Sequence, residues 1–314
     1  MKPELCPICK NKDNLGLVEK FLQWDLFWCS NCDAQFWWPL KHPGQKFYEE
    51  EYDPTGVHGK AALSWGNRQF LRDSILEKGK ILDIGCSFGD FLNELQKRDF
   101  EAWGIDISER SIAVAKALNL RNVYGGTIEA FSARQNVPDF DVVTFFEVIE
   151  HLDDPRSFIK HSKKVLKNGG YLVLSTPDRE CLGGWHDTPP QHLFKWNEKV
   201  LQYLLRSQGF EIVKVVREPI SYKYFFYRFF KSASPLSFGF VAKIKEKLRK
   251  KLVSNKSSND IDILKNKPNT LRLVEQAAKF KIGILKILFV PAVLAGRLLG
   301  LKWQSIYIVA RLEE

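Results

Sequence analysis

The chain has 314 residues, of which 45% are hydrophobic and 27% are charged, and its formal net charge is +10 at pH 7. This composition excludes a disordered chain, and the length exceeds what one typical domain needs, so we expect a folded core with appendages. The opening residues MKPELCPICK have no apolar run behind their charge. They do not resemble a secretory signal, which predicts a cytoplasmic protein with reduced thiols.

Two C-x-x-C pairs near the N-terminus contain four of the six cysteines: Cys6, Cys9, Cys29 and Cys32. Nineteen residues separate the pairs, a spacing typical of zinc ribbons, in which each tight turn presents two thiolates to a tetrahedral ion. A redox pair would need only one C-x-x-C. We therefore predict a zinc ribbon over residues 1–40, with these cysteines as ligands, and a linker over residues 41–60.

Strand and helix patterns alternate after the linker. A helical pattern over residues 64–77 precedes a strand, glycine turn, helix and strand over residues 80–106. The later predicted elements are a helix capped by Ser108 and reaching Leu118, a strand over 122–124, a loop over 125–129, a strand over 142–146, a helix over 155–166 stopped by the turn 168–170, a strand over 171–177, a helix over 197–208, and strands over 211–216 and 304–311. This order predicts an α/β fold with a doubly wound, mostly parallel sheet and a ligand crevice at the carboxyl ends of its strands.

The stretch KILDIGCSFGDFLNELQKRDFEAWGID, residues 80–106, predicts a nucleoside site. Gly85 and Gly89 allow the backbone to approach a ligand closely, and the following helix offers unpaired N–H groups. Asp106 ends the next strand, where a carboxylate can accept both hydroxyls of a ribose. The spacing is G-x-x-x-G and not the G-x-G-x-x-G of dinucleotide sites.

The segment DIGCSFGDFL resembles motif I of the class I S-adenosylmethionine-dependent methyltransferases, whose usual form is D/E-x-G-x-G-x-G. It departs from that form at Ser87, a small residue in place of the middle glycine. The resemblance implies a Rossmann-like core over residues 61–216 and 303–314, with a last strand that is antiparallel and inserts beside the sixth. It also implies the cofactor contacts: Gly85 and Gly89 at the methionine part, Asp106 at the ribose, Ile107 on the adenine, and Asp83 at the turn or the cofactor amino group.

Three further stretches resemble parts of this family's cofactor and acceptor sites. EVIEHL, residues 147–152, resembles the motif after the fourth strand of small-molecule methyltransferases related to the ubiquinone-biosynthesis O-methyltransferases, which implies that Glu147 faces the cofactor and His151 the acceptor. Glu129 follows the third strand, where the family places a polar group near the adenine. The loop 182–196 contains a P-P-x-H-L stretch, which makes His186 and His192 candidate catalytic bases or acceptor ligands. A purely structural role is the alternative for each histidine.

The positive charge is concentrated in residues 217–302, which hold 19 Lys and Arg against 5 Asp and Glu. This segment has a net charge of +14, and the rest of the chain has a net charge of 10 − 14 = −4. YKYFFYRFF (222–230) interleaves aromatics with cations, and VAKIKEKLRKKLV (241–253) forms an amphipathic basic helical pattern. The apolar stretch 282–301 is interrupted by charge and proline, so it does not predict a bilayer span. We expect an insertion before the last strand that attaches to an anionic membrane surface, at the inner face of the membrane, with nucleic acid or a protein partner as alternatives.

The predicted function is methyl transfer from S-adenosylmethionine to a small-molecule, sugar or lipid-linked acceptor in a bacterial cell-surface glycan or natural-product pathway. The first alternative is a ribosomal or transfer RNA methyltransferase with a zinc-ribbon head. Against it, the N-P-P-Y-type tetrad of base N-methyltransferases is absent, and Glu147–Glu150 stands in its place. The second alternative is a non-catalytic protein that binds the cofactor or serves as a scaffold.

Overall fold

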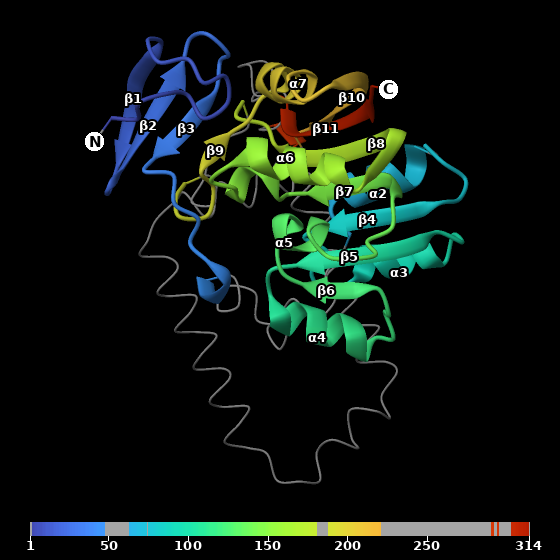
Figure 1. Ribbon diagram of the computed structural model, residues 1–314. Coiled ribbons are helices and arrows are strands. Elements are labelled where there is room, and N and C mark those ends of the chain that lie inside the picture. Colours follow the sequence, from blue (N-terminus) through green and yellow to red (C-terminus); the bar gives the residue numbers. More distant parts are fainter. Residues whose placement is uncertain are drawn as a thin grey trace. The chain divides into compact units, whose positions relative to one another are not determined.

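The computed structural model describes residues 2–47, 63–73, 75–180, 188–220, 290, 291, 294 and 303–313. The chain separates into two compact units, Met1–Glu218 with Trp303–Glu314, and Pro219–Lys302. The first unit holds the elements shown in Figure 1 and discussed below. Most of the predicted basic insertion, and all of its aromatic and amphipathic stretches, lie outside the described residues.

A seven-stranded sheet forms the centre of the first unit, in the order β10-β11-β8-β7-β4-β5-β6. The pairs β4–β5, β4–β7, β5–β6 and β7–β8 are parallel, whereas β11 is antiparallel to β8. The strands are β4 (Lys80–Ile84), β5 (Glu101–Asp106), β6 (Val123–Gly125), β7 (Phe140–Phe146), β8 (Leu166–Pro177), β10 (Phe210–Pro219) and β11 (Trp303–Leu312). The predicted doubly wound sheet is confirmed, including the last strand, which inserts beside the sixth.

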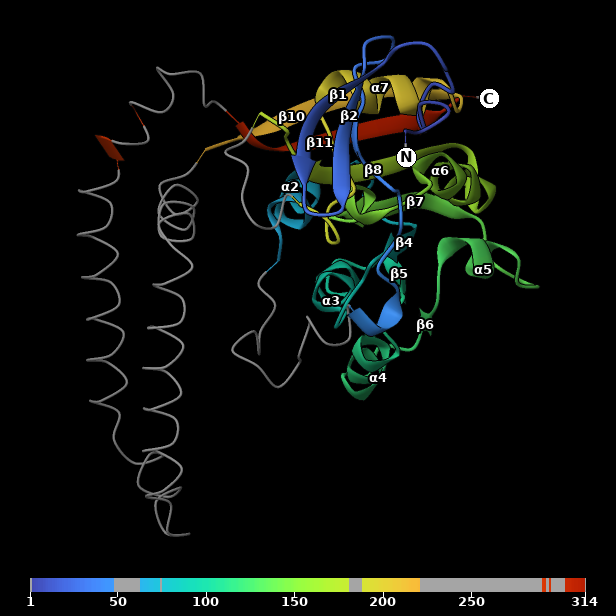
Figure 2. The ribbon, with the colours of Figure 1, turned by 90° about the vertical axis from the view of Figure 1, so that its left-hand side faces the viewer.

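Helices cover both faces of this sheet. They are α2 (Trp65–Asp73), α3 (Asp90–Gln96), α4 (Glu109–Ala117), α5 (Ile128–Ser132), α6 (Pro155–Lys164) and α7 (Glu198–Arg206). Figure 2 shows α2, α3 and α4 on one face and α5 and α6 on the other. Successive strand residues point to opposite faces, so Ile81 packs with the first group of helices and Leu82 with the second.

Local sequence sets the helix starts. Ser108 accepts a hydrogen bond from the Ser111 amide at the start of α4, and Asn197 accepts one from the Val200 amide at the start of α7. A polar cap at each position satisfies an amide that the first helical turn leaves unpaired. The predicted starts of both helices are confirmed.

Several predicted boundaries are wrong, among them the end of the first helix, which we expected at residue 77 and which lies at Asp73. The expected loop 125–129 is interrupted by α5, because Thr127 caps a helix that begins at Ile128 and carries Glu129 in its first turn. The helix expected to reach residue 166 ends at Lys164, and the glycine turn lies within β8. The reason is strand pairing: the Phe140 amide donates to the Val165 carbonyl at 2.8 Å, so the sheet ladder resumes before Gly169, whose φ is +69°.

The cysteine head, residues 2–40, contributes a second, four-stranded sheet. Its strands β1 (Leu15–Phe21), β2 (Trp24–Cys29) and β3 (Gln35–Trp38) are joined by β9 (Phe194–Lys195) from the core, in the order β1-β2-β3-β9. The sequence did not predict β9. One contiguous cluster of buried side chains includes Phe36 of the head and Phe194, Leu201 and Phe145 of the core. The head and the sheet therefore share a hydrophobic core.

Within the described ranges, the structure contains no helix both long and apolar enough to cross a membrane.

Candidate functional site

A cavity of about 670 Å³ lies where β4, β5, β6 and β7 end. Its volume is in the range of small-molecule sites, about 300–1,000 Å³. The predicted site residues that line it are Asp83, Gly85, Asp106, Ile107, Glu129, Glu147 and His151. Gly89 and His192 are not among the lining residues, and His186 lies outside the described part of the chain.

The glycine turn after β4 has a left-handed backbone at three positions. Gly85 has a φ of +81°, and a Cβ added there would lie 2.6 Å from Val148 Cγ2. Gly89 has a φ of +83°, and its added Cβ would lie 2.1 Å from Leu120 Cδ1, so this glycine serves close packing against the end of α4. Ser87 has a φ of +48°, a conformation that glycine adopts at less cost. The Ser87 backbone explains why a glycine usually occupies this place in the motif.

Two carboxylates, the buried Asp83 and the half-buried Asp106, face the cavity at the ends of neighbouring strands. Asp83 is 3% exposed and accepts from the Thr144 hydroxyl at 2.7 Å; burial raises its pKa to about 7, and the nearby Asp106 carboxylate adds to this rise. Asp106 accepts from the backbone amides of Ser87 and Ser108, both at 2.9 Å. Burial also raises the pKa of Asp106, against the lowering effect of these two donors. The site therefore holds two acids whose ionised forms a cation would stabilise.

Glu147 begins the loop after β7 with a φ of +58°, which is unusual for a side chain of this size. Its amide donates to the Ser175 carbonyl at 2.9 Å, and its carboxylate accepts from the Ser175 hydroxyl at 2.8 Å. Strained backbone held in this way often marks a functional site. Here it turns Glu147 toward the cavity lining.

His151 lies on the 3₁₀ helix η1 (Ile149–His151) and is held as a neutral imidazole. Its Nδ1 lies 2.7 Å from the Gln191 carbonyl, which accepts a hydrogen bond, so Nδ1 carries the proton and Nε2 is the basic atom. Burial lowers the pKa of His151 to about 3, and the neighbouring His192 imidazole lowers it further. The His192 ring packs edge-on against the His151 ring, with 4.9 Å between the centroids. His192 thus supports His151 and does not itself line the cavity.

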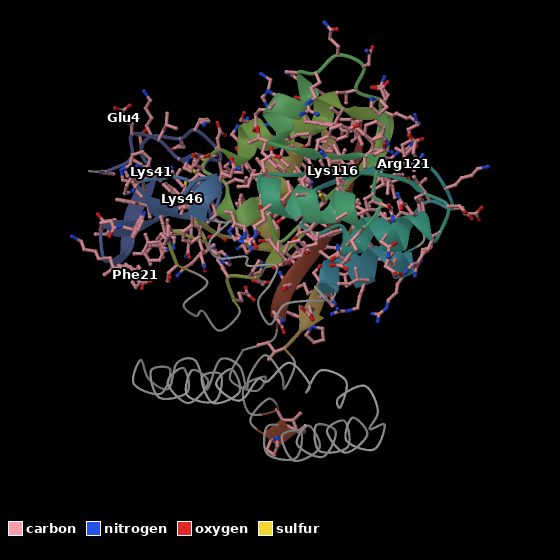
Figure 3. All side chains as sticks on the ribbon, turned by 90° about the horizontal axis from the view of Figure 1, so that it is seen from below. Glu4, Phe21, Lys41, Lys46, Lys116 and Arg121 are labelled. Atoms are coloured by element: carbon pink, nitrogen blue, oxygen red, sulfur yellow. The ribbon has the colours of Figure 1, made fainter. Side chains whose placement is uncertain are left out.

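His42 is among the lining residues that the sequence did not predict. It lies four residues beyond the end of β3 and lines the same cavity. Figure 3 labels Lys41 and Lys46 on the segment that leaves the head. The Nδ1 atom of His42 accepts from the Gly44 amide at 3.1 Å. Nothing in the local pattern distinguishes a histidine in a linker from one at a site.

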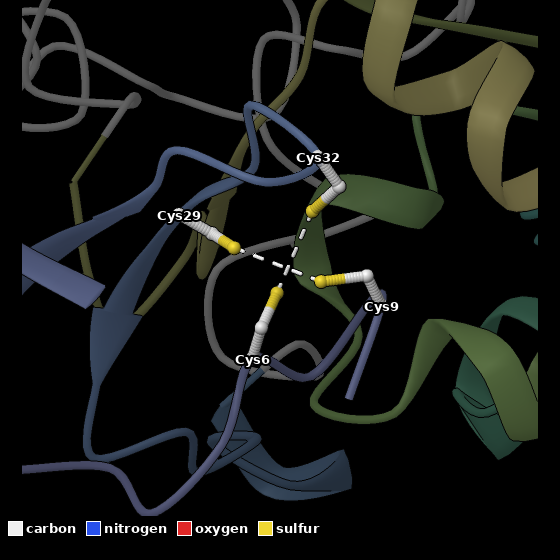
Figure 4. A group of neighbouring side chains, drawn as sticks. All are labelled: Cys6, Cys9, Cys29 and Cys32. Atoms are coloured by element: carbon white, nitrogen blue, oxygen red, sulfur yellow. Dashed lines mark hydrogen bonds between the residues drawn. The ribbon is translucent and has the colours of Figure 1, made fainter. Parts of the chain in front are cut away.

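The four predicted ligand cysteines meet at one point of the head (Figure 4). Their sulfur atoms all lie within 4.8 Å of one another, and Cys6–Cys32 and Cys9–Cys29 are each separated by 3.6 Å. A tetrahedral zinc ion with Zn–S bonds of about 2.3 Å requires sulfurs about 3.8 Å apart, so the cluster fits this ion. The Cys32 thiol donates to Cys6 and lowers the Cys6 pKa to about 5, whereas burial raises the Cys29 pKa to about 11.

Residues 58–215 match the family described as the methyltransferase domain, which is half of the chain. A ubiquinone biosynthesis O-methyltransferase of Pseudomonas aeruginosa is 36% identical over 180 residues, which cover 55% of this chain and 69% of that protein. A protein of the same name from Leptothrix cholodnii is 32% identical over 139 residues, or 42% of this chain and 57% of its own length. The chain thus spans little more than half of the Leptothrix protein.

Among solved structures, phosphoethanolamine N-methyltransferase 2 of Haemonchus contortus, determined with S-adenosyl-L-methionine, has a TM-score of 0.51 and 16% sequence identity. The match covers 86% of this chain and 60% of that one. At this identity the likeness concerns the fold alone.

The cysteine cluster leads to a prediction about metal content. We expect the purified chain to hold about one zinc ion, because four thiolates complete a tetrahedral shell, and we expect Cys32→Ser to lose it. Elemental analysis by mass spectrometry measures the ratio. Cys86→Ser, which removes a buried thiol outside the cluster, is the matched control and should keep the metal. Full zinc occupancy in Cys32→Ser would contradict the four-cysteine site.

Proposed function

Because the chain belongs to the methyltransferase-domain family, we propose that it transfers the methyl group of S-adenosylmethionine to a hydroxyl group of a small-molecule acceptor. The observation that carries this proposal is one cavity that combines a left-handed glycine turn, two carboxylates with raised pKa values and a neutral histidine. The name of the relatives, O-methyltransferase, favours oxygen as the acceptor atom. We propose a sugar or lipid-linked acceptor from a bacterial cell-surface glycan or natural-product pathway.

The cofactor half of the cavity suits the charges of S-adenosylmethionine. In this proposal Asp106 accepts the ribose hydroxyls, while Ile107 packs on the adenine and Glu129 lies beside it. Asp83 and Glu147 face the positively charged methionine part. A cation between buried carboxylates offsets the cost of burying them, which supports a positively charged ligand over an anionic dinucleotide.

The acceptor half needs a group that removes one proton. When the oxygen–methyl bond forms and the sulfur–methyl bond breaks, the hydroxyl proton must leave. His151 lines the cavity with Nε2 as its basic atom, and Glu150 Oε1 lies 4.0 Å from that nitrogen. The Glu150 carboxylate would stabilise the imidazolium as it forms. We propose His151 as the base and His192 as the residue that fixes its ring.

The raised pKa of Asp83 predicts a pH-dependent affinity for the cofactor. The ionised carboxylate attracts the cofactor ammonium group, and protonation below about pH 7 removes this attraction, so the affinity should fall by up to about tenfold per pH unit. Calorimetry between pH 6 and 8 measures it. Asp83→Asn should bind more weakly and lose the pH dependence. Asp141→Asn, at the opposite end of the sheet, is the matched control. Equal affinity of the natural chain at pH 6 and pH 8 would count against this role, and no binding at all would overturn the proposed function.

The assignment of the base predicts a separation between turnover and cofactor binding. His151→Ala should lower kcat by about 100-fold, the typical contribution of a general base, and His192→Ala should lower it less. The affinity for S-adenosylmethionine should stay within about twofold in both variants. S-adenosylhomocysteine release with catechol and with a nucleotide sugar as probe acceptors measures turnover, with His161→Ala as the control. Unchanged turnover in His151→Ala with either probe would rule out this base.

We also propose that residues 217–302 attach the protein to an anionic membrane surface, at the inner face of the membrane, where a lipid-linked acceptor would be met. The support is the sequence alone: a net charge of +14 with interleaved aromatics and an amphipathic basic pattern.

Vesicle sedimentation tests this proposal. We expect binding to vesicles that contain phosphatidylglycerol, weaker binding at high salt, and little binding to phosphatidylcholine alone. A variant with Lys243→Glu, Lys245→Glu and Lys247→Glu should bind less. Equal binding to both vesicle types, or binding to neither, would contradict an electrostatic membrane contact.

A further inference from the structure

A two-residue strand of the core depends on the cysteine head. β9 pairs with β3 through Phe194 opposite Phe36 and Lys195 opposite Gln35, and the Trp37 amide donates to the Leu193 carbonyl at 2.8 Å. A strand of this length has no independent stability, so β9 forms because β3 supplies its partner. Leu193 is the first residue of the core that bonds to β3, and His192 directly precedes it.

Asp33 directly follows the last cysteine of the cluster and binds two core residues, Arg179 and Asn197, that lie on either side of β9 in the sequence. Its carboxylate accepts from Arg179 Nη2 at 2.6 Å and from Asn197 Nδ2 at 2.8 Å, and its carbonyl accepts from Arg179 Nη1 at 2.7 Å. The Asp33 and Arg179 side chains are each 18% exposed. Hydrogen bonds between charged groups at this burial are among the stronger ones in proteins.

The same loop contacts the proposed base. The Leu193 amide donates to the Glu150 carbonyl at 2.8 Å, and the Gln191 carbonyl accepts from His151 Nδ1 at 2.7 Å. The ring of His192 packs on His151. Residues 191–193 therefore hold the Glu150 carbonyl and the His151 imidazole in place. The next residue, Phe194, pairs with Phe36 of the head.

The head also contributes to the cavity wall. The chain leaves β3 and brings His42 to the cavity that His151 also lines. The Gly44 amide donates to His42 Nδ1 at 3.1 Å, so Nε2 carries the proton in the neutral ring.

We propose that the cysteine head is a positioning element for the acceptor end of the cavity. Asp33 is the positioning residue, which acts through Arg179 and β9 on His151, and His42 is the wall residue that the head adds. The inference rests on the proposed function for the meaning of the acceptor end. The face of the head that includes β3 and Asp33 therefore binds the core of the same chain.

Hydrogen exchange on the full-length protein tests the positioning role without a known acceptor. In Arg179→Ala, amides of residues 191–195 should exchange at least about tenfold faster, the factor expected for loss of one charge-assisted hydrogen bond. Zinc content and affinity for S-adenosylmethionine should stay unchanged. Arg179→Lys should restore part of the protection, Asp33→Asn should give a smaller effect in the same direction, and Arg98→Ala is the matched control. Unchanged exchange at residues 191–195 in Arg179→Ala would overturn the positioning role.

Nuclear magnetic resonance of the histidine side chains tests the wall residue. His42→Ala should shift the His151 imidazole signals and leave those of His161 in place, because His151 lines the cavity with His42 and His161 does not. An unchanged His151 signal would remove His42 from the wall. Both experiments proceed even if S-adenosylmethionine fails to bind the natural chain, so failure of the proposed function is recognised separately, by calorimetry.

Discussion

The parallel sheet imposes the constraint on which the rest of the structure depends. Because β4, β5 and β7 run in the same direction, the residues that end them meet at one edge, and these include Asp83, Asp106 and Glu147. Three carboxylates at one edge repel each other and lose solvation. Each is therefore given a donor from a neighbouring element: Thr144, the Ser87 and Ser108 amides, and Ser175. The fold therefore holds three carboxylates in place at this edge of the sheet without a bound ligand.

The two halves of the cavity differ in how they treat charge. At the end that we propose for the cofactor, burial raises the pKa values of Asp83 and Asp106, so a cation that binds there would offset the cost of ionising them. At the end that we propose for the acceptor, burial lowers the pKa of His151 and keeps its ring neutral. The proposed reaction would use both properties, because its donor is positively charged and its acceptor must lose a proton.

The features that sequence reasoning predicted are local. The glycine turn, the Ser108 and Asn197 caps and the alternation of strands and helices along the chain follow from patterns a few residues long, and the structure confirms them. The Arg179–Asp33 contact joins residues that are 146 positions apart in the sequence, and β9 forms by pairing with β3. No local sequence pattern predicts either feature. His42 is missed for the same reason. The misplaced end of the helix before β8 also reflects pairing with a distant strand, which overrides the glycine turn.

A cysteine head at the start of a chain suggests a separate module, and the packing argues otherwise. Cys6, Cys29 and Phe36 belong to the same buried cluster as Leu82 and Phe145 of the central sheet. Arg156 of α6 donates to the Ile8 carbonyl at 2.8 Å, between the two cysteines of the first pair. A metal bound to a preformed site contributes its binding free energy to the fold that creates the site. Since this fold includes β9, a zinc ion in the head would also stabilise the residues 191–193 that contact Glu150 and His151.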